Sequence, residues 1–329
     1  MHTSQLLVRL GASLLCAAGI ANANYAIDDS FDHTNFFEKF DFFSGADPTN
    51  GFVKYASNAA ANTTGLAGYS GNQIYLGVDS TTVNPPGGRG SVRLSSQKSY
   101  THGLFIADIA HMPGGTCGVW PAFWTFGPNW PSSGEIDIIE GVNSNNFDSI
   151  TLHTAAGCNV NAAGSLDGST LLSPNCQGNN GCTITATSPQ GYGAGFNAIG
   201  GGVYAMQWES SGIYVWFFPR NAIPADVTSG SPNPSGWGTP TAKFTGCNID
   251  QFFMNHNIVF DTTFCGDWAG ATSVWSSSCQ ASTGAATCQA YVAANPTAFT
   301  NAYWLINSVK VYSLGASKRD AVVPRPFMA

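Results

Sequence analysis

Three carboxylates lie within six residues of a sequence that otherwise strongly favours a β-strand. The run is Gly134-Glu135-Ile136-Asp137-Ile138-Ile139-Glu140-Gly141. Isoleucine is β-branched and favours strands, and a glycine at each end is typical of strand boundaries. Side chains alternate along a strand, so Glu135 and Asp137 share one face and Glu140 points to the other. A β-bulge at Ile138-Ile139 would bring Glu140 onto the face of the other two acids.

Carboxylates held this close change each other's protonation. Two negative charges about 5.5 Å apart repel by roughly 3 kcal/mol at an effective dielectric near 20, which corresponds to about two pKa units. One acid is then held protonated beside an ionised one, as the chemistry of a retaining glycosidase requires. The ordinary alternative is the solvated face of an amphipathic strand. Charged residues are only 9% of the chain, however, so three acids in one strand are a local concentration.

Aromatic residues crowd the segment before these acids. Trp120, Trp124 and Trp130 all lie within about fifteen residues of Glu135. Sugars present apolar C–H faces that stack on such rings, although core packing is the main alternative for tryptophan. Trp130 is flanked by Asn129 and Pro131 in a turn-like segment, so we expect it to be exposed. Trp268 lies among cysteine and glycine neighbours, which indicates a pinned loop that presents its ring.

A histidine follows the acidic run at a distance that suits the next strand of a hairpin. His153 lies in Thr151-Leu152-His153-Thr154. Next to the acidic strand, it could hydrogen-bond a catalytic carboxylate or a sugar hydroxyl. A lone histidine in a strand is more often structural, and both readings stay open at this point.

The bulk properties indicate a secreted protein with few charges. Residues 1–23 have the form of a signal peptide: Arg9, an apolar core from Leu10 to Ile20, and Ala21-Asn22-Ala23 as the cleavage site. Its removal takes Cys16 and leaves eight cysteines, which predicts up to four disulfides in an oxidising compartment. Proximity favours pairing Cys176 with Cys182 and Cys279 with Cys288. The negative net charge without a Lys/Arg cluster argues against nucleic acid and membranes as partners.

Periodicity predicts strands almost throughout. The expected strands fall near residues 74–78, 92–94, 104–110, 149–154, 203–208, 212–218, 252–260 and 303–312. We expect one short helix near 286–294 and turns at 84–88 and 229–240. These elements predict an all-β protein, a jelly-roll sandwich, as one domain over 24–314. The tail over 315–329 is expected to be disordered or trimmed.

The residues resemble glycoside hydrolase family 16, in particular its laminarinase-like fungal members. The resemblance rests on Glu135-Ile136-Asp137-Ile138-Ile139-Glu140, an ExDxxE motif, and on the Pro-Ala-Phe-Trp segment before it. The extra residue, Ile139, is similar to the bulged laminarinase form rather than the ExDxE form of lichenases and cell-wall transglycosylases. The resemblance implies a concanavalin A-like jelly roll of two antiparallel sheets with a sugar-binding cleft on the concave sheet.

The resemblance also implies a role for each candidate residue. Glu135 is the expected nucleophile, Glu140 the acid/base, and Asp137 the residue that holds or tunes the nucleophile. His153 resembles the family histidine beside the acid/base. The aromatic residues expected to bind sugar are Trp124, Trp130 and Trp268.

The sequence therefore predicts a secreted enzyme whose chemistry requires no metal and no organic cofactor. No HExxH, CxxC or GxSxG motif is present in the sequence. The expected activity is endo-hydrolysis of β-1,3-glucans, including mixed β-1,3/1,4 or 1,6-branched ones, by a monomer whose partner is the β-glucan. A transglycosylase with the same carboxylates and a non-catalytic glucan-binding protein are the alternatives.

Overall fold

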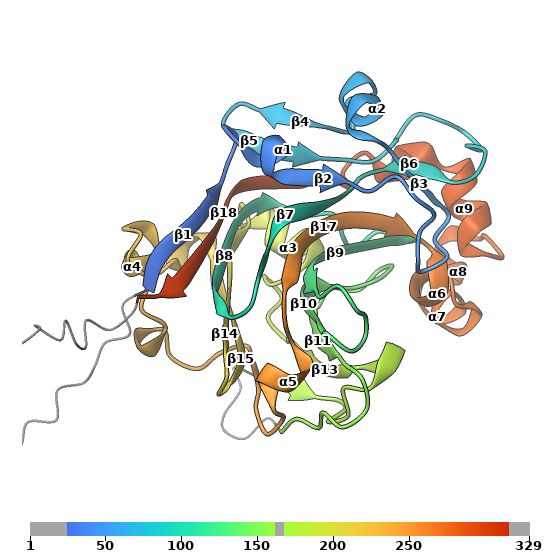
Figure 1. Cartoon of the computed structure of the whole chain (residues 1–329). Coiled ribbons are helices and arrows are strands. Elements are labelled where there is room, and N and C mark those ends of the chain that lie inside the picture. Colours follow the sequence, from blue (N-terminus) through green and yellow to red (C-terminus); the bar gives the residue numbers. More distant parts are fainter. Residues whose placement is uncertain (1–24, 162–167, 316–329) are drawn as a thin grey trace, which may run out of the picture.

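A computed structural model describes residues 25–161 and 168–315. The predicted signal peptide lies outside these residues, as does the predicted tail beyond Gly315. Figure 1 shows the described part as two layers of strands with short helices at the ends and edges. Within the described residues, no helix combines the length and the hydropathy needed to cross a bilayer.

One layer is an eight-stranded sheet. Its hydrogen-bonded order is β16 (Ala242–Phe244), β15 (Gly212–Pro219), β14 (Gly202–Glu209), β8 (Gly103–His111), β18 (Trp304–Leu314), β5 (Gln73–Leu76) and β4 (Ala67–Ser70), and β1 (Tyr25–Phe31) pairs with β18. Every pairing in this sheet is antiparallel. Strand β4 has a single neighbour, so it forms one edge of the sheet.

The second layer, also of eight strands, carries the acidic run. Its order is β12 (Thr170–Leu171), β13 (Cys182–Thr185), β11 (Ser149–His153), β10 (Glu135–Glu140), β9 (Val119–Phe126), β17 (His256–Phe264), β7 (Arg93–Tyr100) and β2 (Phe40–Phe42). These pairings are antiparallel as well. The two antiparallel sheets confirm the predicted β-sandwich. A small parallel pair, β3 (Val53–Tyr55) and β6 (Arg89–Ser91), lies outside both sheets.

The core fills the space between the layers because each strand turns alternate residues inward. Phe123, Ile136 and Phe260 come from the acidic sheet and are at most 1% exposed. From the opposite sheet, the Trp304 ring packs edge-on against Phe260 at 5.5 Å. The residues between these inward positions face away from the core, and this outer face carries the acids.

Helices are short and more numerous than the sequence predicts. They are α1 (Phe36–Lys39), α2 (Asn58–Thr63), α3 (Gly193–Ala198), α4 (Ala225–Thr228), α5 (Ile249–Phe252), α6 (Gly266–Ala269), α7 (Thr272–Ser278), α8 (Gln280–Thr283) and α9 (Cys288–Ala294), with 3₁₀ turns η1 (Gly178–Asn180), η2 (Arg220–Ala222), η3 (Pro234–Gly236) and η4 (Pro296–Phe299). Helix α9 confirms the predicted helix near 286–294. The strand expected from residue 252 is wrong at its start, because 249–252 form α5 and β17 begins at His256.

Four disulfides join described residues, and one of the two predicted pairs is wrong. Cys176–Cys182 is present as expected. Cys279 does not bond Cys288: the pairs are Cys117–Cys279 and Cys265–Cys288, and Cys158–Cys247 completes the set. Helices α7 and α8 lie between Cys265 and Cys288 and bring Cys279 to the start of β9 instead. Two disulfides thus tie the helical segment α6–α9 to the sheet that holds the acids.

Candidate active site

The acidic strand β10 contains the predicted bulge. Against β9, Glu135 lies opposite Phe126 and Asp137 opposite Trp124, after which the register shifts and Glu140 lies opposite Ala122. Ala122, Trp124 and Phe126 alternate along β9 and share its outer face. The extra residue therefore places all three acids on the outer face of the sheet, while the three isoleucines between them are buried.

Asp137 is the central acid and forms an ion pair with His153. Its Oδ2 atom lies 3.2 Å from His153 Nε2, and Asp137 is 1% exposed. His153 Nδ1 donates to the carbonyl of Gly178 at 2.7 Å, so both ring nitrogens have partners. Burial disfavours the imidazolium, but the hydrogen bond and charge of Asp137, with the charge of Glu135, outweigh it and raise the pKa of His153 to about 10. His153 therefore faces Asp137 as an imidazolium near neutral pH.

His153 confirms the expected hairpin and faces a carboxylate of the site. Strand β11 pairs with β10 over Glu135 to Asp137, and His153 lies directly opposite Glu135. Its ring contacts Asp137, and its charge also acts on Glu140.

Glu135 is half-buried and bound to an exposed indole. Trp130, which is 46% exposed, donates its Nε1–H to Glu135 Oε2. Burial and the charge of Asp137 raise the pKa of Glu135 to about 8, while the His153 cation and the Trp130 hydrogen bond act in the opposite direction. The exposure predicted for Trp130 is confirmed, and its polar edge is directed at a carboxylate of the site.

Glu140 has its own indole partner, which the sequence analysis did not select as a sugar contact. Trp120 Nε1 donates to Glu140 Oε1 at 2.8 Å. Trp268 packs edge-on against Trp120, with ring centroids 5.6 Å apart. Burial and the charge of Asp137 raise the pKa of Glu140 well above its usual range. Trp120 lies on the same strand face as Trp124, so the two-residue alternation before the acids was the signal for it.

Comparison with known proteins identifies the family of this chain. A family model described as an XgeA-like, catalytic GH16 domain matches residues 40–312. The endo-1,3(4)-β-glucanase of Arthroderma benhamiae is 45% identical over 327 residues, which cover 96% of this chain and 70% of that protein. The chain belongs to glycoside hydrolase family 16.

Solved family 16 structures share its fold. Laminarinase 16A from Phanerochaete chrysosporium, described with 6-O-glucosyl-laminaritriose in donor and acceptor sites, is 43% identical with a TM-score of 0.83. An elongating family 16 β-1,3-glucosyltransferase is 45% identical with a TM-score of 0.82. Both alignments cover 88% of this chain and 100% of the other. The chain spans only about half the length of some fungal relatives, such as 54% of an Aspergillus clavatus protein named a probable endo-1,3(4)-β-glucanase.

Trp124 of this family 16 chain lies next to the acids but offers little surface. It is 9% exposed, and its Nε1–H donates to Asp261 Oδ1 at 3.3 Å. The guanidinium of Arg93 covers the ring at 4.8 Å from its centroid, and Phe126 stacks on it at 5.0 Å. Burial raises the pKa of Asp261 to about 6, an effect that Arg93 opposes. Trp124 thus supports the surface beside the acids more than it forms that surface.

The donor atoms of Glu135, Asp137 and His153 lie within 4.8 Å of one another, a spacing that could hold a metal ion. The two nitrogens of His153 are already engaged, however, and its raised pKa keeps the ring protonated. A protonated imidazole has no lone pair for a metal. In this protonation state the three residues form an ion-paired cluster.

Asp148, on the loop between β10 and β11, was not predicted and holds the bulge. The register shift leaves Glu140 unpaired with β11, and Asp148 Oδ1 accepts the Glu140 backbone N–H at 2.8 Å. Asp148 is 1% exposed, and burial raises its pKa to about 8. A single acid in a polar turn carries no sequence signal for such a contact.

Two variants of Asp148 test this contact. Asp148→Ala leaves a buried N–H without an acceptor, which costs about 1–3 kcal/mol and frees the backbone of Glu140. We expect kcat on a soluble β-glucan to fall roughly 100-fold, with KM changed less than about twofold. Asp148→Asn keeps an acceptor oxygen and is expected to stay within about threefold of wild type. Equal losses in the two variants contradict this role.

The charge of Asp137 sets the pH range in which the glutamates keep a proton. It raises the pKa of both Glu135 and Glu140, so Asp137→Asn lowers both values. The alkaline limb of kcat/KM, where the proton of the acid is lost, should move to lower pH. Asp250→Asn, which removes one exposed negative charge on α5, is the control and should leave the limb in place. A limb that stays fixed in Asp137→Asn refutes the electrostatic role.

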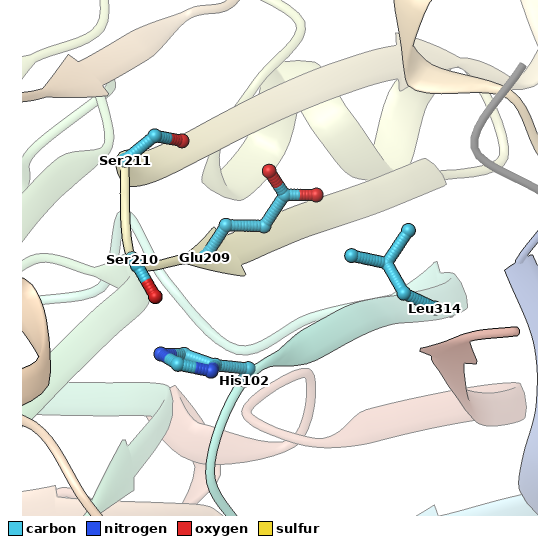
Figure 2. Close-up of a pocket in the computed structure, with 5 residues that line it drawn as sticks. All are labelled: His102, Glu209, Ser210, Ser211 and Leu314. Atoms are coloured by element: carbon cyan, nitrogen blue, oxygen red, sulfur yellow. The ribbon is translucent and has the colours of Figure 1, made fainter. Parts of the chain in front are cut away.

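A hollow of about 300 Å³ lies at the end of the opposite sheet, and none of Glu135, Asp137 and Glu140 lines it. Figure 2 shows the residues that line it. It is lined by His102, Glu209, Ser210, Ser211 and Leu314, from the β7–β8 and β14–β15 turns and the end of β18. Its single carboxylate, Glu209, accepts from Tyr25 at 2.6 Å and is part of the opposite sheet. No pair of acids faces it, so the chemistry described above belongs to the outer face of β10.

Proposed function

We propose that this chain is a secreted endo-β-glucanase that hydrolyses internal β-1,3 linkages, in mixed β-1,3/1,4 and 1,6-branched glucans as well, with retention of anomeric configuration. The bulged strand β10 carries the proposal, because it sets Glu135 and Glu140 on one face with Asp137 between them. Family membership and the 45% identity to the A. benhamiae endo-1,3(4)-β-glucanase support the same activity.

In the proposed mechanism, Glu135 and Glu140 act in two steps. The Glu135 carboxylate attacks the anomeric carbon while Glu140 donates its proton to the glycosidic oxygen, and the bond between that carbon and oxygen breaks. The result is a glycosyl ester on Glu135. Glu140 then takes a proton from water, whose oxygen attacks the same carbon and releases Glu135. Two inversions leave the configuration unchanged.

The surroundings of the two glutamates are similar in kind and favour one retained proton. Burial and the negative charge of Asp137 raise the pKa of both, while an indole donor and the His153 cation favour the ionised form of each. The proposed mechanism assigns the proton to Glu140, as the general acid, and the charge to Glu135, as the nucleophile. Asp137 is the positioning residue, held by His153 between them.

The indoles on this face are the proposed sugar contacts. Trp130 is exposed, and Trp120 and Trp268 form a half-buried edge-to-face pair beside Glu140. Rings of this kind take the apolar face of a pyranose. The proposed substrate is accordingly a β-glucan chain that lies across β10, with Trp130 near one side of the cleaved bond and Trp120 with Trp268 near the other.

Transglycosylation is the second candidate. The similarity to an elongating β-1,3-glucosyltransferase at 45% identity favours it specifically. The same ester on Glu135 would then be released by a glucan hydroxyl instead of water. A non-catalytic binding role is less consistent with two glutamates that each have an indole donor.

The test is to incubate the purified chain with laminarin and to follow reducing ends and product lengths together. Hydrolysis predicts new reducing ends and steadily shorter chains. Products longer than the substrate with few new reducing ends would favour the transferase. Binding to laminarin without either change would contradict both enzymatic candidates. Cellulose, which has only β-1,4 linkages, serves as the control substrate and should remain intact.

Secretion is proposed on two grounds. The sequence carries the features of a signal peptide, and the four disulfides require an oxidising compartment. We propose that the secreted form acts as a monomer, which size-exclusion chromatography with light scattering tests directly.

A further inference from the structure

The chain contains one Asn-X-Ser/Thr sequence in which X is not proline, Asn62-Thr63-Thr64. Such a sequence is an acceptor for N-linked glycans in secreted proteins. In the structure Asn62 lies in the last turn of α2 and is exposed, as are Thr63 and Thr64. Helix α2 ends at Thr63, and Gly65 just beyond it has a φ of 71° and open space around it.

Asn62 lines a hollow of about 470 Å³ between α2 and the β4–β5 hairpin. Figure 1 shows α2 beside β4 at the end of its sheet. The hollow is also lined by Gly65, Gly68, Tyr69 and Tyr75. Its volume is within the range of small-ligand sites. No carboxylate or cationic side chain lines it, so an uncharged occupant suits it.

One face of the Tyr75 ring is open to the hollow because its cross-strand partner, Gly68, has no side chain. Gly68 lies directly across from Tyr75 in the hairpin, and a Cβ on Gly68 would meet nothing within 4 Å. Tyr75 is half-buried and is held from behind by Tyr303, which itself stacks on His111 at 3.9 Å. Tyr69 lies opposite Ile74, so its ring points to the other face of the hairpin and packs against Phe37. Aromatic rings with open surface are suited to the C–H face of a sugar.

The hollow also adjoins an unprotected sheet edge. Within residues 25–161 and 168–315, strand β4 pairs with β5 alone, so no described strand pairs with the N–H and C=O groups on its other side. Edges of this kind favour pairing with other chains unless something covers them. A polar group over this hollow would offer hydrogen bonds to these backbone groups.

We propose that Asn62 carries an N-linked glycan whose first residues lie in this hollow, against Gly68 and Tyr75, and cover the β4 edge. The inference rests on the proposed secretion and not on the glucanase activity. The Asn62 amide nitrogen attacks C1 of a lipid diphosphate-linked oligosaccharide in the secretory compartment. The N–C1 bond forms, the bond from C1 to the phosphate oxygen breaks, and the amide proton leaves with the diphosphate.

The experiment uses the full chain secreted from a yeast host. Intact mass and glycopeptide mapping should place a glycan on Asn62 in wild type and remove it in Asn62→Gln. Thr64→Ser keeps the acceptor sequence and should keep the glycan. A secreted wild-type chain without a glycan at Asn62 overturns the proposal at this first step, whatever its activity on glucans.

Hydrogen exchange then tests the placement of the glycan. Amides in the peptide spanning 65–72 should exchange about fivefold faster in Asn62→Gln than in the glycosylated chain, the factor that about 1 kcal/mol of local stability gives. In Tyr75→Leu, which removes the stacking ring, loss of the glycan should change this exchange less than twofold. Peptides covering 135–140 should be unaffected throughout. Equal exchange at 65–72 with and without the glycan overturns the proposed docking.

Discussion

Replacement of Glu135 by glutamine is expected to lower kcat on laminarin by about 10⁴-fold or more. The amide is nearly the same size and can still accept the Trp130 hydrogen bond, but it cannot form the glycosyl ester. Folding and laminarin binding should therefore be preserved, and reducing-end release with affinity electrophoresis measures the two separately.

Glu209→Gln is the matched control for this variant. Glu209 lies at the end of β14 on the opposite sheet, where it accepts from Tyr25 at 2.6 Å, and glutamine can still accept there. Its activity should remain within about twofold of wild type, because the same chemical change is made away from the acids. Near-wild-type turnover in Glu135→Gln would show that Glu135 is not the nucleophile.

Glu140→Gln is expected to have the second largest effect, a loss of about 10²–10⁴-fold on natural glucans. Trp120 can still bind the amide, so the geometry should be retained while the transferable proton is lost. The alkaline limb of the pH profile should disappear, because the pKa that is raised by burial and by Asp137 belongs to the group removed.

Substrates with different leaving groups distinguish a general-acid role of Glu140 from a structural one. In an aryl β-glucoside with an acidic phenol, the phenolate leaves without needing a proton. With this substrate, Glu140→Gln should therefore form the glycosyl ester on Glu135 nearly as fast as wild type does. The burst of phenol measures the rate of ester formation. If this rate fell in Glu140→Gln as much as the rate on laminarin does, the general-acid role would be contradicted. An unchanged alkaline limb on laminarin would do the same.

The geometry of the acidic strand β10 could be predicted from its residue pattern. The period of two and the one surplus residue between Asp137 and Glu140 were enough to predict a bulge and a common face, and the structure has both. Strands such as β8 and β14 followed from the same alternation. These features are local, since they depend on neighbours along one strand.

Contacts between distant segments could not be read in the same way. Asp148 holds the backbone of Glu140 from a loop, and Trp268 reaches Trp120 from a helix more than 140 residues away. Helices α6 to α8 are short, α7 is rich in serine, and the segment lacks the 3.6-residue periodicity that marks a packed helix. Their folding brings Cys279 to Cys117, which proximity along the chain could not indicate.

The most direct test of the account is to trap the glycosyl ester. A 2-deoxy-2-fluoro-β-laminaribiosyl donor with a good leaving group should form its ester quickly and hydrolyse it slowly, because the fluorine destabilises both oxocarbenium-like transition states. Peptide mass mapping of the trapped protein should then find one glycosyl group, on Glu135. A label on Glu140, or turnover to the inverted anomer without any label, would contradict the assignment of the two glutamates.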